Sequence, residues 1–230
     1  MLTTVLKVLI GLAVIAVLGY LVVAGMAWRY QDRMVFPAPR GPLPHPTSLG
    51  IADGERVTVR TSDGVALQGW YLPPNPAPAQ GTTAPGLIWF YGNMETVEGI
   101  APALRDFRPP GIAVLALDYR GYGSSGGEPT EQGVYLDAEA AWEYLVGRPA
   151  IDSTRIAVYG RSVGSAVALY LATEQPVRAV ILIEMGRAVA RAGRAEALIE
   201  IPEAGHNDTY FYGGTMYISR FHEFLRTHLR

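Results

Sequence analysis

The chain of 230 residues contains no cysteine, and only 17% of its residues are charged. Without cysteine there are no disulfides, no thiol nucleophile and no Cys-x-x-Cys metal site, although this absence identifies no redox compartment. The net charge is −2 and the basic residues form no blocks, so nucleic acid is not expected as a partner. His, Asp and Glu nowhere have the spacing of metal ligands, and we expect neither a metal nor a cofactor.

Charge is missing altogether from one stretch near the start of the chain, the 21 residues from Val8 to Trp28. As a helix this stretch is roughly 30 Å long, the thickness of the hydrocarbon core of a bilayer. Basic residues flank it on both sides. We predict an uncleaved transmembrane anchor in residues 1–30, with the domain behind it exported. A cleaved signal peptide is the alternative, but the apolar run is too long for one.

The rest of the chain is divided by composition. Five prolines between Pro37 and Pro46 predict an extended tether, placed at residues 31–50. Residues 51–230 suffice for one domain, in which short apolar runs alternate with segments of helical periodicity. This alternation predicts an α/β domain with a mostly parallel, doubly wound sheet and an antiparallel hairpin at one edge.

The expected elements have the following bounds. Strands are predicted at residues 55–61, 65–72, 86–91, 112–117, 155–159, 177–183 and 197–201. Helices are predicted at residues 95–107, 130–146, 163–173, 186–192 and 214–229.

A strand, a sharp turn and a helix meet at one serine, in the sequence Gly160-Arg161-Ser162-Val163-Gly164. A backbone that reverses this tightly leaves no room for side chains beside the serine, which explains the glycine on each side. Ser162 is then lifted above the sheet as a nucleophile. The N–H of Val163, at the start of the helix, can stabilise the negative oxygen that forms when a serine attacks a carbonyl.

Two other patterns compete with this one, and both lie in the glycine-rich residues 121–127. Gly123-Ser124-Ser125-Gly126-Gly127 also matches GxSxG, but no strand leads directly into it and no helix begins at its serine. The same stretch formally matches the dinucleotide motif GxGxxG. Residues 118–120 separate that match from the preceding strand, and Pro129 delays the next helix. Neither pattern has the structural context that its function requires.

A serine nucleophile needs a base, and the chain has four histidines. His206 follows an expected strand, at the edge of the sheet where open α/β proteins place their sites. His45 lies in the tether, and His222 and His228 lie among polar positions of the last helix, where solvated histidines are usual. We therefore predict that His206 is the general base.

With these residues placed, the chain resembles the α/β-hydrolase superfamily, in particular its membrane-anchored single-domain serine hydrolases. The resemblance covers nearly everything from Gln31 onward. Its motifs are Tyr91-Gly92-Asn93, the glycine-rich stretch from Asp118 to Gly126, Gly160-Arg161-Ser162-Val163-Gly164, and Pro202 to Asp208.

The resemblance implies a catalytic triad of serine, histidine and an acid, in that chain order. It also implies an oxyanion hole built from the N–H of Val163 and the N–H of Asn93 or Met94. Tyr91 stands where the family often has a histidine, so the oxyanion geometry is expected to differ in detail.

One departure from the family pattern concerns the acid. Such hydrolases normally place two strands, a cap segment and the acid between nucleophile and histidine, whereas only 44 positions separate Ser162 from His206 here. The segment with the cap and the usual aspartate is missing from the pattern. Glu184, which ends the strand next to the serine strand, is our first substitute. Asp208 is expected to brace its own loop instead, and Asp118 to order the glycine-rich loop.

The sequence therefore predicts a membrane-anchored serine hydrolase that acts on a small or lipid-derived acyl ester in a shallow pocket. The alternative is a non-catalytic remnant or binding protein, because loss of the triad acid costs on the order of 10⁴ in turnover in serine proteases.

Overall fold

The computed structural model describes residues 2–183 and 209–230. It divides into two compact units, Met1–Pro37 and Ala38–Arg230. The predicted helix at residues 186–192 and the predicted strand at residues 197–201 lie outside the described residues.

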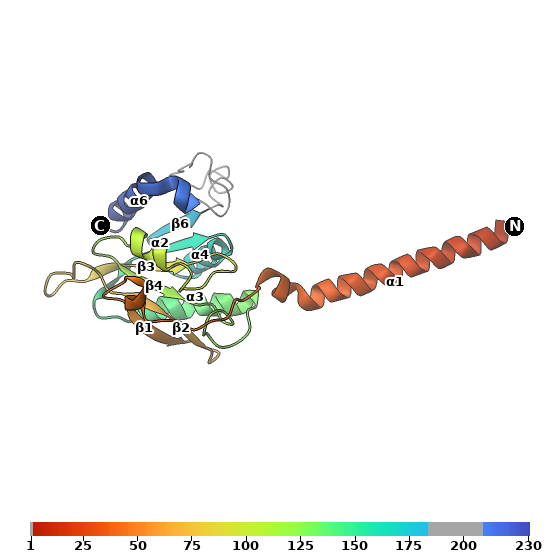
Figure 1. Ribbon diagram of the computed structural model, residues 1–230, viewed down its shortest axis with the longest axis horizontal. Helices are drawn as coiled ribbons and strands as arrows, with labels where there is room; N and C mark the ends of the chain where they lie inside the picture. The colour runs from red at the N-terminus through yellow and green to blue at the C-terminus, as the bar shows by residue number, and fades with distance from the viewer. Residues whose placement is uncertain (1, 184–208) are drawn as a thin grey trace. The chain divides into compact units, whose positions relative to one another are not determined.

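The first unit consists of helix α1 (Leu2–Val35), drawn in red in Figure 1. By length and composition it can cross a membrane, as the uncharged run of the sequence predicts. The apolar side chains along it are exposed, among them Leu12, Val17 and Val22.

The second unit contains a six-stranded sheet, as far as the described residues show, in the order β1-β2-β4-β3-β5-β6. The strands are β1 (Glu55–Arg60), β2 (Ala66–Leu72), β3 (Ala84–Phe90), β4 (Ala113–Leu117), β5 (Ile151–Arg161) and β6 (Ala179–Ile183). Strands β4, β3, β5 and β6 run parallel to one another, while β2 is antiparallel to both β1 and β4. The predicted fold class is thus confirmed, including the antiparallel pair at one edge.

Burial follows the pattern of each strand. In β4 all five residues are buried, as its continuous apolar run predicts for a strand covered on both faces. In β1 buried residues alternate with exposed ones, because one face of this edge strand faces solvent.

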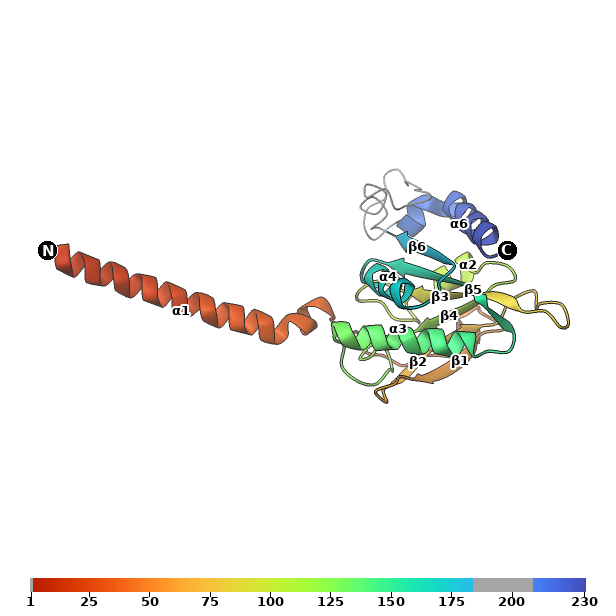
Figure 2. The same cartoon turned by 180° about the vertical axis from the view of Figure 1, so that it is seen from behind.

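Helices cover both faces of the sheet. They are α2 (Ala101–Phe107), α3 (Glu131–Val146), α4 (Val163–Glu174) and α6 (Thr209–His228), with a short 3₁₀ helix, η1 (Pro46–Leu49). Helices α3 and α4 pack together on one face, seen in front in Figure 2, and α2 packs with α6 on the other. Helix α3 begins where predicted, because the hydroxyl of Thr130 accepts a 3.0 Å hydrogen bond from the N–H of Gly133.

An aromatic cluster joins α6 to the sheet. Trp89 of β3 stacks on Tyr159 of β5 with 3.9 Å between ring centroids, and Phe221 of α6 lies edge-on to Tyr159. The helix is interrupted at Gly214 (φ 49°, ψ −144°), the residue at which the sequence predicted its start. His222 is half-buried on this helix, and its Nε2 lies 3.0 Å from the carbonyl oxygen of Phe107.

Helix α2 is much shorter than predicted. Of the predicted residues 95–107, only those from Ala101 onward are helical, and the residues before Ala101 form turns. In these turns the N–H of Val97 donates to Asp118 at 2.7 Å instead of closing a helical turn. Helical propensity is a weak preference, and a distant hydrogen-bond partner overrides it here.

The proline-rich stretch belongs to the second unit from Ala38 onward. Arg40 donates hydrogen bonds to the carbonyl oxygens of Ser125 and Gly127, at 3.0 and 3.1 Å. The indole N–H of Trp70, a fully buried residue, donates to the carbonyl oxygen of Pro44 at 3.1 Å. This part of the expected tether is thus fixed on the domain.

Candidate active site

Ser162 lies directly after β5, between the last residue of the strand and the first residue of α4. Its backbone has φ 52° and ψ −121°. Only glycine adopts this conformation without steric cost, so a serine there stores on the order of 1–3 kcal/mol of strain. Because β5 is paired on both sides, with β3 and β6, the serine projects from the middle of the parallel part of the sheet.

The two flanking glycines are required by close backbone contacts. A Cβ atom at Gly160 would lie 2.4 Å from the carbonyl oxygen of Gly164. A Cβ atom at Gly164 would lie 2.4 Å from the carbonyl oxygen of Phe90, at the end of β3. Both distances are far below van der Waals contact. The close backbone contacts thus confirm the steric reason predicted for the two glycines.

The end of β6 lies beside this turn. The N–H of Ser162 points to the carbonyl oxygen of Ile183 at 3.4 Å. The hydroxyl of Ser165, a fully buried residue, lies 2.9 Å from the carbonyl oxygen of Gly160 and 3.3 Å from that of Ile183. The turn is held between β5 and β6 by these contacts.

Two sources of N–H groups meet near the serine. Val163 is the first residue of α4, and N–H groups in the first turn of a helix have no partner within the helix. The other source is the loop after β3, where a Cβ atom at Gly92 would lie 3.5 Å from Cβ of Ser162. Asn93 and Met94 follow Gly92 in this loop. The N–H of Met94 donates to Oδ1 of Asn93 at 3.0 Å.

A glutamate that was not among the predicted site residues links this loop to the serine turn. Oε2 of Glu95 accepts a 2.7 Å hydrogen bond from the N–H of Gly92, and Oε1 lies 2.5 Å from Nη1 of Arg161. The partners are 66 positions apart. No local pattern predicts such a pair, and the only signal is opposite charge beside two separate motifs.

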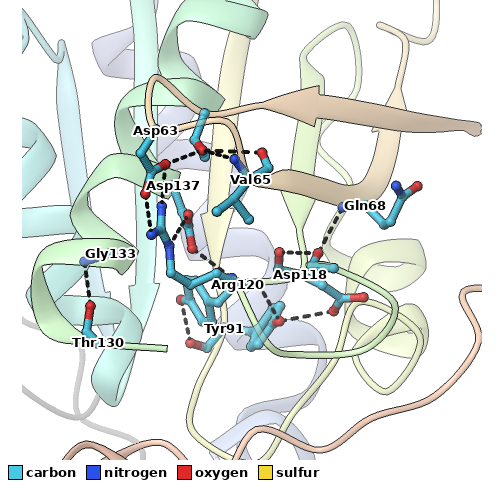
Figure 3. Close-up of polar contacts among 12 residues, drawn as sticks. Asp63, Val65, Gln68, Tyr91, Asp118, Arg120, Thr130, Gly133 and Asp137 are labelled. Carbon is cyan, nitrogen blue, oxygen red and sulfur yellow. Dashed lines mark hydrogen bonds and ion pairs between the residues drawn. The ribbon is translucent and has the colours of Figure 1, made fainter. Parts of the chain in front are cut away.

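Beneath the loop lies a buried carboxylate, shown in Figure 3. Oδ1 of Asp118 accepts hydrogen bonds from the N–H of Val97 at 2.7 Å and from the hydroxyl of Tyr91 at 3.0 Å. Oδ2 has no hydrogen-bond partner in the described part of the chain. Burial raises the pKa of Asp118 to about 6, against the lowering effect of its hydrogen bonds. These bonds order the loop after β3, rather than the glycine-rich loop as expected.

The glycine-rich loop is held instead by Arg120 (Figure 3). Its Nε donates to Asp137 of α3 at 2.8 Å, and its Nη1 donates to Asp63 in the turn between β1 and β2, also at 2.8 Å. The hydrogen bond from Arg120 lowers the pKa of Asp63 to about 2. One guanidinium thus ties the loop to a helix and to the edge hairpin.

The serine of the second GxSxG pattern has a structural role. Ser125 is 1% exposed, and its hydroxyl donates to the carbonyl oxygen of Asp118 at 2.8 Å. The same hydroxyl accepts from the N–H of Gln68 at 2.8 Å. The first contact lies within the loop, and the second binds the loop to β2. The two patterns therefore differ in structure as their sequence contexts predict.

A cavity of about 270 Å³ lies next to the loop after β3. Residues 39–42 line it together with Met94, Glu95, Asp118 and Gly123. Ser162 is not among the residues that line this cavity, so we assign the cavity no part in the chemistry of the serine. Among residues 2–183 and 209–230, no group of three or more His, Asp or Glu side chains could hold a metal ion.

The structure brings four predicted site residues into two adjacent segments, Ser162 with Val163 in the turn and Asn93 with Met94 in the loop after β3. His206 and Glu184, the predicted base and acid, lie outside the described residues, as does Asp208.

Comparisons with known proteins place these segments in a wider group. A hydrolase family model described as serine aminopeptidase, S33, matches residues 85–199, which is half of the chain. The protein Rv2307c of Mycobacterium tuberculosis is 36% identical over 186 residues, or 80% of this chain. Protein bem46 of Schizosaccharomyces pombe is 34% identical over 179 residues, or 75% of this chain. The chain spans 64% and 58% of the lengths of these two relatives.

A solved structure, the esterase Pf2001 of Pyrococcus furiosus, superposes with a TM-score of 0.61 at 20% sequence identity. The match covers 84% of this chain and 100% of that chain. At this level of identity the likeness establishes the fold.

Proposed function

The chain belongs to the α/β-hydrolase superfamily, and we propose that it is a serine hydrolase of carboxylic esters with Ser162 as the nucleophile. The observation that supports this most directly is the backbone of Ser162, a non-glycine residue at φ 52° and ψ −121° between a central strand and a helix. This strained turn places a hydroxyl at the carboxyl end of the parallel strands, next to N–H groups of a helix N-terminus.

In the proposed reaction, Oγ of Ser162 attacks the carbonyl carbon of the ester while His206 takes the serine proton. The carbon–oxygen bond to the alcohol then breaks, and the alcohol leaves with that proton. Water, deprotonated by the same histidine, attacks the acyl-serine and releases the carboxylic acid and the free serine. Atoms and charges balance without a cofactor.

The oxyanion of both tetrahedral intermediates would be stabilised by the N–H of Val163 and by a second N–H from the loop after β3. Of the two candidates in that loop, we favour Asn93, because it directly follows Gly92, where an added Cβ atom would lie 3.5 Å from Cβ of Ser162. Loss of one such donor typically lowers kcat by about 10²–10³.

Glu184 is proposed as the acid that orients His206. It follows Ile183, whose carbonyl oxygen lies 3.4 Å from the N–H of Ser162. The strand that leads into Glu184 thus ends beside the nucleophile. A carboxylate supplied from there would hold the imidazole in the required tautomer.

The experiment uses the full chain in detergent. A fluorophosphonate probe should label the wild type and not Ser162→Ala, and nitrophenyl acetate hydrolysis should fall by at least 10³ in Ser162→Ala and His206→Gln. Glu184→Gln should lower turnover by on the order of 10² to 10⁴. Absence of labelling in the folded wild type would indicate a non-catalytic member of the superfamily, and an unchanged rate in Glu184→Gln would remove that residue as the acid.

The ester is proposed to be small or lipid-derived, because α1 has the length and composition of a membrane anchor. The domain behind the anchor is proposed to be exported. Protease treatment of intact cells should then remove the domain and leave α1 protected. A domain that resists the protease in intact cells but is digested after lysis would reverse this orientation.

A further inference from the structure

Glu95 joins two segments whose relative position matters for the proposed reaction. We call residues 91–95 the oxyanion loop and residues 160–164 the nucleophile elbow. Glu95 accepts the N–H of Gly92 within the loop at 2.7 Å and pairs with Arg161 of the elbow at 2.5 Å. Its two carboxylate oxygens therefore each hold one of the two segments.

The arrangement is tight around Gly92. A Cβ atom there would lie 3.0 Å from Oε2 of Glu95, 3.2 Å from Nη1 of Arg161 and 3.5 Å from Cβ of Ser162. The ion pair thus passes directly beside the nucleophile residue. Since the N–H of Gly92 is directed at Glu95, the contact constrains the Tyr91–Gly92 peptide group, one peptide group before the one that carries the N–H of Asn93.

The charges of the pair also matter for the reaction. A carboxylate near the oxyanion would oppose the negative charge that develops on the substrate oxygen. Arg161 neutralises that carboxylate. The side chain of Arg161 is only 19% exposed and that of Glu95 29%, so solvent screens their charges incompletely. The pair can hold the loop without placing a net charge at the site.

We propose that Glu95 and Arg161 are positioning residues that fix the oxyanion loop against the nucleophile elbow, so that the N–H groups of Asn93 and Val163 converge on one oxygen. The proposal rests on the proposed serine hydrolase function. Arg161, the residue directly before the nucleophile, is a variable position of the GxSxG pattern and has a specific role here.

Substitutions at Glu95 separate its hydrogen bond from its charge. Glu95→Ala removes both and should lower kcat for nitrophenyl acetate by about 10- to 100-fold with KM changed less than about 3-fold, because the oxyanion exists only in the transition state. Glu95→Gln keeps an acceptor for Gly92 and should recover most of this loss. Glu98→Ala, an exposed glutamate in the same connection, is the matched control and should behave as wild type.

Arg161→Met tests the charge. It leaves the Glu95 carboxylate unpaired, so kcat should fall further than in Glu95→Ala. The double variant should then be more active than Arg161→Met alone, because the repelling carboxylate is gone. Such a reversal would not arise if the pair only stabilised the fold.

Amide hydrogen exchange gives a readout that does not depend on activity. Peptides covering residues 90–97 should exchange faster in Glu95→Ala than in the wild type or Glu98→Ala, while peptides of β4 remain protected. If the wild type hydrolyses no ester and takes no probe, the proposed function fails, and the exchange data still decide whether Glu95 holds the loop. Equal kcat or equal exchange in Glu95→Ala and Glu98→Ala would overturn the inference.

Discussion

The hydroxyl of Tyr122 donates a 2.9 Å hydrogen bond to Oδ1 of Asn93, and the tyrosine is fully buried. Tyr122 comes from the glycine-rich loop after β4, and Asn93 from the oxyanion loop after β3. The side chain of Asn93 also accepts the N–H of Met94, so one amide oxygen connects the loops that follow two adjacent parallel strands. The position of the proposed oxyanion donor therefore depends on a residue 29 positions away.

The first prediction concerns this hydrogen bond. Tyr122→Phe should lower kcat by roughly tenfold with little change in KM, and should destabilise the fold by about 1 kcal/mol. Tyr135→Phe removes a tyrosine hydroxyl that binds Glu131 at an exposed position, and serves as the control. Ester hydrolysis and thermal melting of the three proteins decide the point. A loss of stability with unchanged kcat would show that Tyr122 is only a packing residue.

The glycines of the elbow should be irreplaceable for steric reasons. In Gly164→Ala the new Cβ would lie 2.4 Å from a main-chain oxygen of β3, and we expect destabilisation of about 3 kcal/mol or more and loss of probe labelling. In Gly126→Ala the nearest atom is 3.5 Å from the new Cβ, which is an ordinary contact. The φ angle of Gly126 is not in the positive region, so alanine can adopt it without strain. That variant should melt and label as wild type does. A stable, labelled Gly164→Ala protein would contradict the elbow geometry.

The stability of the domain should depend on pH through Asp118. Its pKa rises from 3.8 to about 6 on folding, so the folded state binds the proton more tightly and stability falls as pH rises from about 4 to about 6. The loss amounts to roughly 3 kcal/mol at neutral pH, since one pKa unit corresponds to about 1.4 kcal/mol.

Asp118→Asn isolates this effect. Asparagine keeps an acceptor for Val97 and Tyr91 but does not titrate. The stability of the variant relative to the wild type should therefore increase as pH rises from 4 to 7. Denaturant unfolding at several pH values measures the difference. Parallel curves for the two proteins over this range would show that Asp118 is not the titrating group.

Substitution of the two serines of the GxSxG patterns should have different effects on stability and on probe labelling. Ser125→Ala leaves the buried N–H of Gln68 without its acceptor and should cost about 1–3 kcal/mol of stability, while probe labelling of the folded fraction persists. Ser162→Ala should lose labelling and keep its stability. Ser124→Ala, at the exposed position directly before Ser125, should change neither property. Loss of labelling in folded Ser125→Ala would require the assignment of the nucleophile to be revised.

Local patterns were sufficient to predict much of the fold. The uninterrupted apolar run of β4, the cap at Thr130 and the glycines around Ser162 each contain their own physical reason within a few residues. The elbow could be predicted because its steric requirement is met by neighbours in the sequence, Gly160 and Gly164.

What could not be predicted depends on distant partners. Residues 95–100 have helical periodicity, but Asp118 takes the N–H of Val97, 21 positions away. The pairing of Glu95 with Arg161 and the bond from Tyr122 to Asn93 likewise arise only when strands β3, β4 and β5 lie side by side. His206 and Glu184 stay predictions from the sequence.

The docking of residues 38–50 determines where the domain can be cut. Removing them, as a boundary at Ile51 would, takes the carbonyl acceptor of Pro44 from the indole of Trp70 and removes the buried side chain of Leu43 from the core. It also releases the glycine-rich loop from Arg40. A soluble fragment for crystallisation or enzymology should therefore begin at Ala38, and one that begins at Ile51 is expected to aggregate for reasons unrelated to its catalytic residues.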